Sequence, residues 1–223
     1  ILVIGQNPGT NHPRMLTALA ACKENGGSVV SINPLEETAM KRFKHPQNPL
    51  HLIGRGVQIA DEHLPVRIGV DAALLQGFAK TMLSKGGTDP DFISKNTLGF
   101  EDWKRHIEST DWETIVEQSG ISRDRIEKTG TAIAKSERMI VCWAMGLTQH
   151  RNGVGVIQEV VNLLLLNGHV GRPGAGFCPV RGHSNVQGDR TVGIWEAPSE
   201  AFLKRMEEGR RRSQDLLGMR TMR

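Results

Sequence analysis

Aromatic residues and cysteines are scarce in this sequence. Among its 223 residues, 4% are aromatic, none is tyrosine and three are cysteine. Single-stranded nucleic acids stack their bases on exposed aromatic side chains, so this scarcity argues against a nucleic-acid partner. Cys22, Cys142 and Cys178 form no C-x-x-C pair, so this stretch has no zinc or iron–sulfur motif, and we predict that it ligates no metal. We interpret each cysteine as a small buried apolar side chain, and the lack of disulfide spacing favours a reducing compartment, the cytoplasm.

A membrane-spanning run and a large excess of charge are missing as well. The longest apolar patch, residues 160–166, contains Asn162 and is too short to cross a bilayer, so we predict a buried helix there. The 28 Lys and Arg against 24 Asp and Glu give a net charge of +4. Such a small positive excess suits phosphate-bearing ligands, but it is too dispersed to indicate nucleic acid.

The chain begins inside an apolar stretch, Ile1–Ile4, and has no initiator methionine. Its N-terminus has neither the charged region nor the small-residue cleavage site of a signal peptide. We therefore expect an internal fragment of a longer protein that starts within a β-strand. The sequence indicates no oligomeric state.

The first third of the pattern predicts a β–α–β unit. Residues 1–4 and 28–32 are short apolar stretches typical of strands. Between them lies a turn-forming loop, 5–12, and then a helix that we expect to begin at Pro13 and to end at the glycines after Asn25. Two strands joined in this way lie parallel in one sheet.

The rest of the pattern extends this unit to an α/β fold with a doubly wound, mostly parallel sheet flanked by helices. Residues 36–61 predict an irregular insertion. The further elements predicted are strands at 64–68 and 138–143 and helices at 72–83, from 88–91, at 103–107, 111–118, 122–136 and 153–166. We expect Asp71 and Ser122 to cap two of these helices, and Ile126, Ala132 and Ile133 to face inward.

Four polar segments follow predicted strands. Ligands of a doubly wound sheet bind beyond the carboxyl ends of its strands, so we expect these segments to form one site. The candidate binding residues in them are Gly5, Gln6, Asn7, Thr10, His12, Asn33, Gly69, Asp71, Met145, Gly146 and Gln149.

Each segment also has a simpler interpretation. Residues 5–12 predict a phosphate-binding loop at a helix N-terminus, but they lack G-x-G-x-x-G, and a plain turn remains the alternative. Asn33 stands where nucleotide-binding folds often have an acidic residue for ribose, but it is also a turn residue before proline. Asp71 has the acceptors to read the N1–H and N2–H₂ edge of guanine, and the alternative is the helix cap.

The segment 180–188 is polar and glycine-containing, so a packed core does not explain it. Its sequence, VRGHSNVQG, predicts a loop that wraps a polar, anionic ligand. The histidines near the proposed site, His150, His169 and His183, do not have metal-ligand spacing.

Several motifs together carry a family resemblance. They lie in order along the chain at residues 4–8 with 12–13, 32–34, 67–74, 97–101, 144–150, 162–174 and 181–188. These motifs resemble those of the bis-molybdopterin guanine dinucleotide oxidoreductases, and the formate dehydrogenase alpha-subunit-like branch fits best.

The resemblance implies a Rossmann-like domain over residues 1–180 that binds the guanosine end of one cofactor. Residues 181–223 would then form a cofactor-contacting loop and the incomplete start of an adjoining domain. The implied cofactors of the whole protein are molybdenum or tungsten with two pterins, and a [4Fe–4S] cluster that this stretch does not ligate. The metal-ligating residue would lie upstream, so the fragment alone would be inactive. A small-molecule substrate and an electron-transfer partner are implied, without a membrane span.

The resemblance also assigns roles within the loop. Arg181 matches the active-site arginine beside the metal, where a guanidinium holds a carboxylate and stabilises negative charge. His183 stands beside Arg181 where glutamine is usual, so formate is not fixed as the substrate. Asn33 stands where aspartate is usual. Further cofactor contacts are implied at Gly182, Asn185, Val186 and Gly188. The alternatives are a generic nucleotide-binding α/β domain and a non-catalytic relative that keeps the fold.

Overall fold

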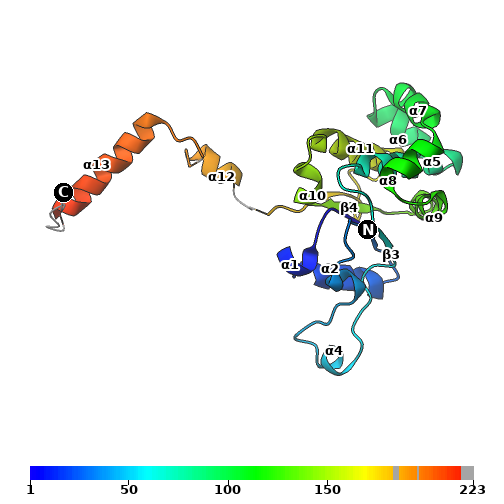
Figure 1. Cartoon of the computed structure of the whole chain (residues 1–223), viewed down its shortest axis with the longest axis horizontal. Helices are drawn as coiled ribbons and strands as arrows, with labels where there is room; N and C mark the ends of the chain where they lie inside the picture. The colour runs from blue at the N-terminus through cyan, green and yellow to red at the C-terminus, as the bar shows by residue number, and fades with distance from the viewer. Residues whose placement is uncertain (183–185, 195, 217–223) are drawn as a thin grey trace. The chain divides into compact units, whose positions relative to one another are not determined.

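The computed structural model describes residues 1–182, 186–194 and 196–216. The chain divides into two compact units, 1–182 and 183–223, and the domain assignment made from the sequence remains a prediction. The elements in chain order (Figure 1) are β1 Leu2–Ile4, α1 Pro8–Asn11, α2 Met15–Glu24, β2 Val30–Ile32, α3 Thr38–Lys41, α4 Pro49–Ile53, β3 Glu62–Leu64, α5 Asp71–Ser84, α6 Pro90–Asn96, α7 Phe100–Ser109, α8 Trp112–Ser119, α9 Arg123–Ala134, β4 Ile140–Trp143, α10 Met145–Thr148, α11 Gly153–Leu166, β5 Gly176–Pro179, α12 Val186–Thr191 and α13 Glu200–Leu216.

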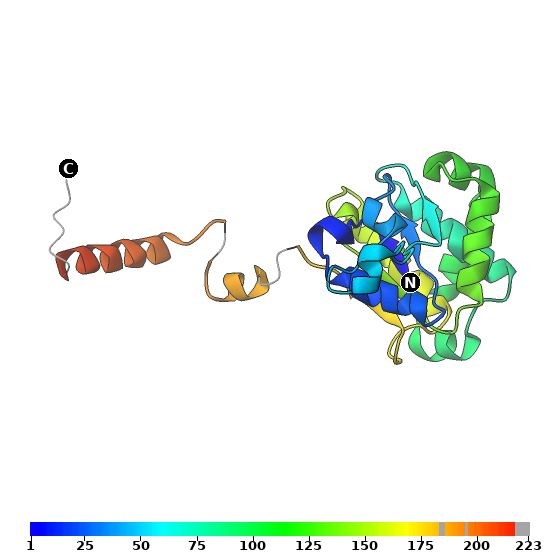
Figure 2. The same ribbon diagram turned by 90° about the horizontal axis from the view of Figure 1, so that it is seen from below.

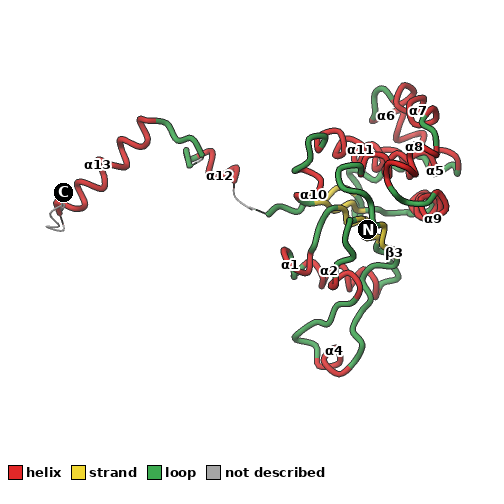
Figure 3. The backbone as a smooth tube through the Cα atoms, in the orientation of Figure 1, coloured by secondary structure: helices red, strands yellow, loops and turns green. Residues whose placement is uncertain are grey.

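The five strands of the first unit form one sheet in the order β3-β2-β1-β4-β5. All four pairings are parallel, with Val3 opposite Ser31 on one side and Cys142 on the other. The strands lie side by side in the middle of the unit (Figure 3). The chain first adds β2 and β3 on one side of β1 and then β4 and β5 on the other. The predicted doubly wound α/β fold is confirmed.

Both faces of the sheet are covered because its strands bury alternate side chains on opposite sides. Leu2 and Ile4 of β1 join a core with α5, α8, α9 and α11, whereas Val3 joins a core with α2 and α3. The helices α5 to α9 gather on one side of the sheet in both views (Figures 1 and 2). Strands covered on both faces read as continuous apolar runs, as in β1 and β4.

The helix α5 is the centre of the larger core. Leu74, Phe78 and Met82, one turn apart, are all 0% exposed. This i, i+4, i+8 spacing places them on one face of the helix. Burying each such side chain contributes about 1.5–3 kcal/mol relative to leaving it in water, so this stripe is a principal source of stability in the unit.

The N-terminal loop contains a short helix that its sequence pattern did not predict. Pro8 begins the short helix α1, and Asn7 caps it by accepting a hydrogen bond from the Thr10 amide at 3.2 Å. The next helix begins at Met15 and not at Pro13. Proline suits the first position of a helix, and the chain uses Pro8 in that role.

The third strand lies earlier than predicted, at Glu62–Leu64 and not at 64–68. Its polar residues hid it from the apolar pattern. Glu62 is half-buried because Arg125 and Lys128 of α9 bind its carboxylate. The predicted strand residue Ile68 lies beyond the strand and is exposed.

The sequence pattern predicted no strand at the position of β5. This strand pairs with β4, opposing Cys178 to Cys142, and it lies at the edge of the sheet, where Pro179 is tolerated. The interpretation of the cysteines as buried holds for Cys142 only, since Cys178 is exposed and Cys22 is half-buried.

Smaller expectations also differ from the structure. Ala132 is exposed, and the Ser122 side chain makes no capping hydrogen bond at the start of α9. The insertion at 36–61 holds the short helices α3 and α4 and an antiparallel bridge between Phe43 and Val57. The helix predicted at 153–166 is α11, with the same bounds. Among the described residues, no helix has the length and apolarity needed to cross a membrane.

Candidate functional site

A cavity of about 280 Å³ lies at the carboxyl ends of β1 and β4. It is lined by Gly5, Gln6, Asn7, Asn11, His12, Ala144, Met145, Gly146 and Gly182. In the strand order 3-2-1-4-5, the connections reverse direction between β1 and β4. Such a switch point opens a crevice between the two loops that leave the strands, and ligands of open α/β sheets bind there.

Two glycines let the loops meet through their backbones. The Gly146 amide donates a hydrogen bond to the Gly5 carbonyl oxygen at 3.1 Å. Gly5 has a φ of +57°, and a Cβ added to it would lie 2.7 Å from Leu147 Cδ1. A Cβ on Gly146 would overlap the Gly5 carbonyl oxygen. Side chains are therefore excluded here, and the floor of the cavity is main chain.

Gln6 brings an unsatisfied polar atom to this cavity. Its side chain is 4% exposed, and its Oε1 has no partner among the described residues. Leaving a buried acceptor unpaired costs about 1–3 kcal/mol. A hydrogen-bond donor on a bound ligand would recover that energy.

His12 connects the β1 loop to the segment around Arg181. Its Nε2–H donates to the Arg181 carbonyl oxygen at 2.9 Å. Because a carbonyl only accepts, Nε2 carries the proton in the neutral ring, and Nδ1 is the acceptor that faces Gln6 Nε2 at 3.5 Å. This chain of contacts holds the Arg181 backbone beside the cavity.

Glu37 links the end of β2 to the loop after β1, and no sequence motif indicated this residue. Asn7 Nδ2 donates to Glu37 Oε2 at 2.6 Å, and Asn33 Nδ2 donates to Glu37 Oε1 at 3.1 Å. Glu37 directly precedes α3 and lies four residues after Asn33 in the chain.

Gly69 and Asp71 pack against the loop that follows β4. Asn152 Nδ2 donates to the Gly69 carbonyl oxygen at 3.2 Å. Asp71 is 5% exposed, and this burial raises the pKa of its carboxyl group, partly offset by its own backbone amide and by His150. The prediction that Asp71 caps α5 is wrong, because the helix begins at Asp71 itself and its N-cap is Val70.

The structure brings together only part of the predicted set. The predicted residues that line the cavity are Gly5, Gln6, Asn7, His12, Met145, Gly146 and Gly182. The predicted residues that do not line it are Thr10, Asn33, Gly69, Asp71 and Gln149. His183 and Asn185 lie outside the described residues, and Val186 and Gly188 belong to α12 in the second unit. Asn11 and Ala144 are lining residues that the prediction lacked.

The helix α1 gives little support to the predicted phosphate-binding loop at residues 5–12. It has four residues, so its dipole is short. Its cap is already occupied, since Asn7 Oδ1 accepts the Thr10 amide. The case for an anionic ligand therefore rests on the polar lining of the cavity.

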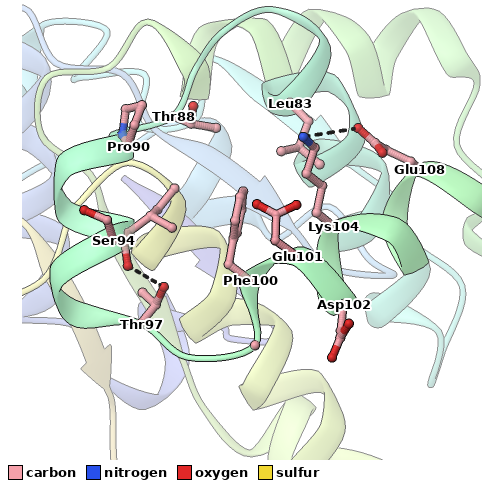
Figure 4. Close-up of a pocket in the computed structure, with 12 residues that line it drawn as sticks. Leu83, Thr88, Pro90, Ser94, Thr97, Phe100, Glu101, Asp102, Lys104 and Glu108 are labelled. Carbon is pink, nitrogen blue, oxygen red and sulfur yellow. Dashed lines mark hydrogen bonds and ion pairs between the residues drawn. The ribbon is translucent and has the colours of Figure 1, made fainter.

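A larger cavity of about 610 Å³ lies in the helical layer (Figure 4). It is formed mainly by α6 and α7, and four residues of the 97–101 motif line it, namely Thr97, Gly99, Phe100 and Glu101. Its polar groups are largely paired, as Lys104 is with Glu108 at 4.0 Å and Thr97 Oγ1 with the Ile93 carbonyl at 2.7 Å. The unpartnered buried side-chain atoms of the described residues belong to Gln6, Ser31, His63 and His169, none of which lines it.

Metal-ligating side chains are not gathered at either cavity. Within residues 1–182, 186–194 and 196–216, no three His, Cys, Asp or Glu side chains are placed to hold one ion. The features present at the sheet edge are a main-chain floor, an unpaired amide oxygen and several amide and imidazole side chains. These suit a polar organic ligand.

Comparisons with known proteins agree on one family. A family model described as molybdopterin oxidoreductase matches residues 1–206. Protein YdeP of Escherichia coli is 45% identical over 219 residues, which are 93% of this chain and 29% of that protein. Formate dehydrogenase H of Escherichia coli is 29% identical over 194 residues, 86% of this chain and 25% of that protein. The chain thus spans less than a third of the length of these relatives.

A solved structure supports the fold. Acetylene hydratase from Pelobacter acetylenicus matches with a TM-score of 0.65 at 21% identity, covering 78% of this chain and 22% of that one. At this identity the likeness concerns the fold alone.

Proposed function

The chain belongs to the molybdopterin oxidoreductase family, and we propose that it forms the part of a molybdenum- or tungsten-dependent oxidoreductase that binds a molybdopterin guanine dinucleotide. The observation that carries this proposal is the cavity at the switch point between β1 and β4, with Gly182 at its wall. A long dinucleotide would lie across the strand ends of such a sheet. Arg181, whose carbonyl oxygen accepts the His12 Nε2–H, would lie next on that track toward the metal.

The residues present fit this cofactor. The unpaired Gln6 Oε1 offers an acceptor for a ligand N–H or O–H, and the Asn11 side-chain amide offers N–H donors for phosphate oxygens. Gly5 and Gly146 keep the floor free of side chains, so a pyrophosphate can approach the main chain. Asp71 has the two acceptor oxygens that the N1–H and N2–H₂ edge of guanine requires.

The chemistry of the whole protein is a two-electron oxidation or reduction of a small molecule. When bound, the metal centre supplies the electron transfer. In this chain, we propose that Arg181 holds an anionic substrate and that His183 contributes to proton handling. Formate remains one candidate substrate because a relative with 29% identity is a formate dehydrogenase, whereas His183 stands where glutamine is usual, so formate is not fixed as the substrate. An electron-transfer partner, a [4Fe–4S] cluster ligated outside this chain and a cytoplasmic location complete the proposal.

Metal and pterin analysis of the full-length protein tests this function. We expect molybdenum or tungsten by mass spectrometry of the metal content, and GMP together with a fluorescent oxidised pterin after acid release. Full-length protein that contains neither metal nor pterin would refute the proposal. A generic nucleotide-binding domain would release a nucleotide without pterin, and a non-catalytic relative would keep the cofactor without turnover.

A further inference from the structure

A carboxylate lies at the end of β2, although the residue that carries it comes later in the chain. Nucleotide-binding sheets of this topology commonly have an Asp or Glu at the end of the second strand, where it accepts hydrogen bonds from ribose hydroxyls. Here that position is Asn33, which has no charge. The structure brings the carboxylate of Glu37 back to it, with Asn33 Nδ2 at 3.1 Å from Glu37 Oε1.

Glu37 is also tied to the cavity. Its other oxygen, Oε2, accepts a hydrogen bond from Asn7 Nδ2 at 2.6 Å, and Asn7 lines the cavity. The Glu37 backbone is held in place as well, since its carbonyl oxygen accepts the Met40 amide at 3.0 Å. The carboxylate therefore bridges the loop after β1 and the end of β2.

The charge of Glu37 remains available to a ligand. Its neighbour Glu36 pairs with Lys41 at 2.6 Å, whereas the part of the chain that the structure describes contains no ion pair to Glu37. A carboxylate has about four acceptor positions, and the two amides use one on each oxygen. Two positions are left for hydroxyl groups.

Asn33 supplies a hydrogen-bond donor to the Glu37 carboxylate. Its Nδ2 donates both to Glu37 and to the Leu35 carbonyl oxygen at 3.0 Å. An aspartate at position 33 would place two carboxylates at hydrogen-bond distance with no proton between them, which is unfavourable. The amide at 33 and the carboxylate at 37 thus belong together as one pair.

We propose that Glu37 is the ribose-binding residue of this site and accepts hydrogen bonds from the 2′ and 3′ hydroxyls of the nucleotide. This rests on the proposed function, because it assumes a ribonucleotide at the sheet edge. It replaces Asn33, which the sequence suggested, as the residue that recognises ribose. Asn33 becomes the residue that positions Glu37.

The test is calorimetric binding of GMP to full-length protein prepared without its cofactor. Glu37→Gln removes the charge with little change of shape, and Glu36→Gln is the matched control on the adjacent residue. Hydrogen bonds to a charged group correspond to about 10–100-fold in affinity. We expect Glu37→Gln to weaken GMP binding by that factor and Glu36→Gln to leave it within about twofold.

Two further measurements separate recognition from folding. The wild type is expected to prefer GMP over 2′,3′-dideoxy-GMP, and Glu37→Gln is expected to lose that preference while its melting temperature matches the wild type. In the double variant Asn33→Asp/Glu37→Gln, the carboxylate moves to position 33, and GMP binding is expected to recover. Asn33→Asp alone keeps both carboxylates and is expected to bind GMP more weakly than the double variant.

The outcomes distinguish this proposal from the one it rests on. If the wild type contains pterin and binds GMP but Glu37→Gln binds GMP equally well or keeps the ribose preference, Glu37 is not the ribose-binding residue and the proposed function stands. If the wild type contains no pterin and binds no GMP, both proposals are overturned.

Discussion

The cavity at the carboxyl edge of the sheet and the helical layer of α5, α8 and α9 are built from opposite chemistry. The layer buries apolar side chains such as Phe78, and among the described residues its helices carry no unpartnered buried side-chain nitrogen or oxygen. The edge keeps an unpaired amide oxygen on Gln6, and Asp71, at the very start of α5, adds a buried carboxylate; both are unfavourable in the absence of a ligand. Stability therefore depends mainly on the helical layer, and binding depends on the edge of the sheet. Substitutions in the layer should lower the free energy of unfolding, whereas substitutions at the edge should lower cofactor binding or turnover.

The largest effect is expected in the helical layer. Phe78→Ala leaves a cavity in the core of α5 and is expected to lower the free energy of unfolding by about 3–5 kcal/mol. Chemical denaturation of the full-length protein measures this. Phe177→Ala on β5, where the side chain is 52% exposed, is the control and should cost under about 1 kcal/mol. Equal losses for the two variants would contradict the contrast between the regions.

Arg181→Ala addresses the other region, where activity and not stability should respond. Under the proposed function the Arg181 guanidinium holds an anionic substrate, so its loss is expected to lower turnover by the full-length protein by about 10–100-fold. Metal and pterin contents should stay at wild-type levels. Arg205→Ala on the exposed face of α13 serves as the control. Unchanged turnover in Arg181→Ala would remove this residue from the active site.

Alanine substitutions at two glycines compare a position at the sheet edge with one inside a helix. Gly146→Ala would force the added Cβ against the Gly5 carbonyl oxygen, at a cost of about 1–3 kcal/mol, and is expected to lower pterin content. Gly155→Ala meets no atom within 4 Å and lies inside α11, so it is expected to stabilise by about 0.4–1 kcal/mol. Normal pterin content in Gly146→Ala would show that the main-chain floor does not contact the cofactor.

The smallest effects are two pH dependences of opposite sign. Burial raises the pKa of Asp71, so its contribution to stability is full below its unfolded value of 3.8 and is lost as the pH rises through the folded pKa. The hydrogen bond from Arg125 lowers the pKa of Glu62, so its contribution is present above 4.5 and is lost as the pH falls through the folded pKa.

Unfolding of cofactor-free protein between pH 3 and about pH 7 measures both contributions. Relative to the wild type, Asp71→Asn should gain stability as the pH rises, whereas Glu62→Gln should lose stability over the same change. The Glu62 effect should stay under about 1 kcal/mol because its ion pair is partly exposed. Two variants that shift in the same direction would show that Asp71 is not destabilised by burial.

Much of the framework was predictable from the sequence because its signals are local. The strands β1, β2 and β4 follow from short apolar runs, and the helix α11 follows from its length and apolar content. The family resemblance rests on the same kind of short motif. The strand β3 was misplaced because the polar residue Glu62 carries no local strand signal. The strand β5 was missed because the exposed residue Cys178 carries none either.

For the site, local sequence patterns indicate which loops leave the carboxyl ends of the strands. Which of their side chains meet depends on how the chain folds in three dimensions. Gln6 faces His12, His12 binds the Arg181 carbonyl 169 residues away, and Glu37 takes the place of the missing charge at Asn33. The physical reason is that strand pairing brings distant segments to one edge, and a hydrogen bond depends on that placement and not on spacing along the chain.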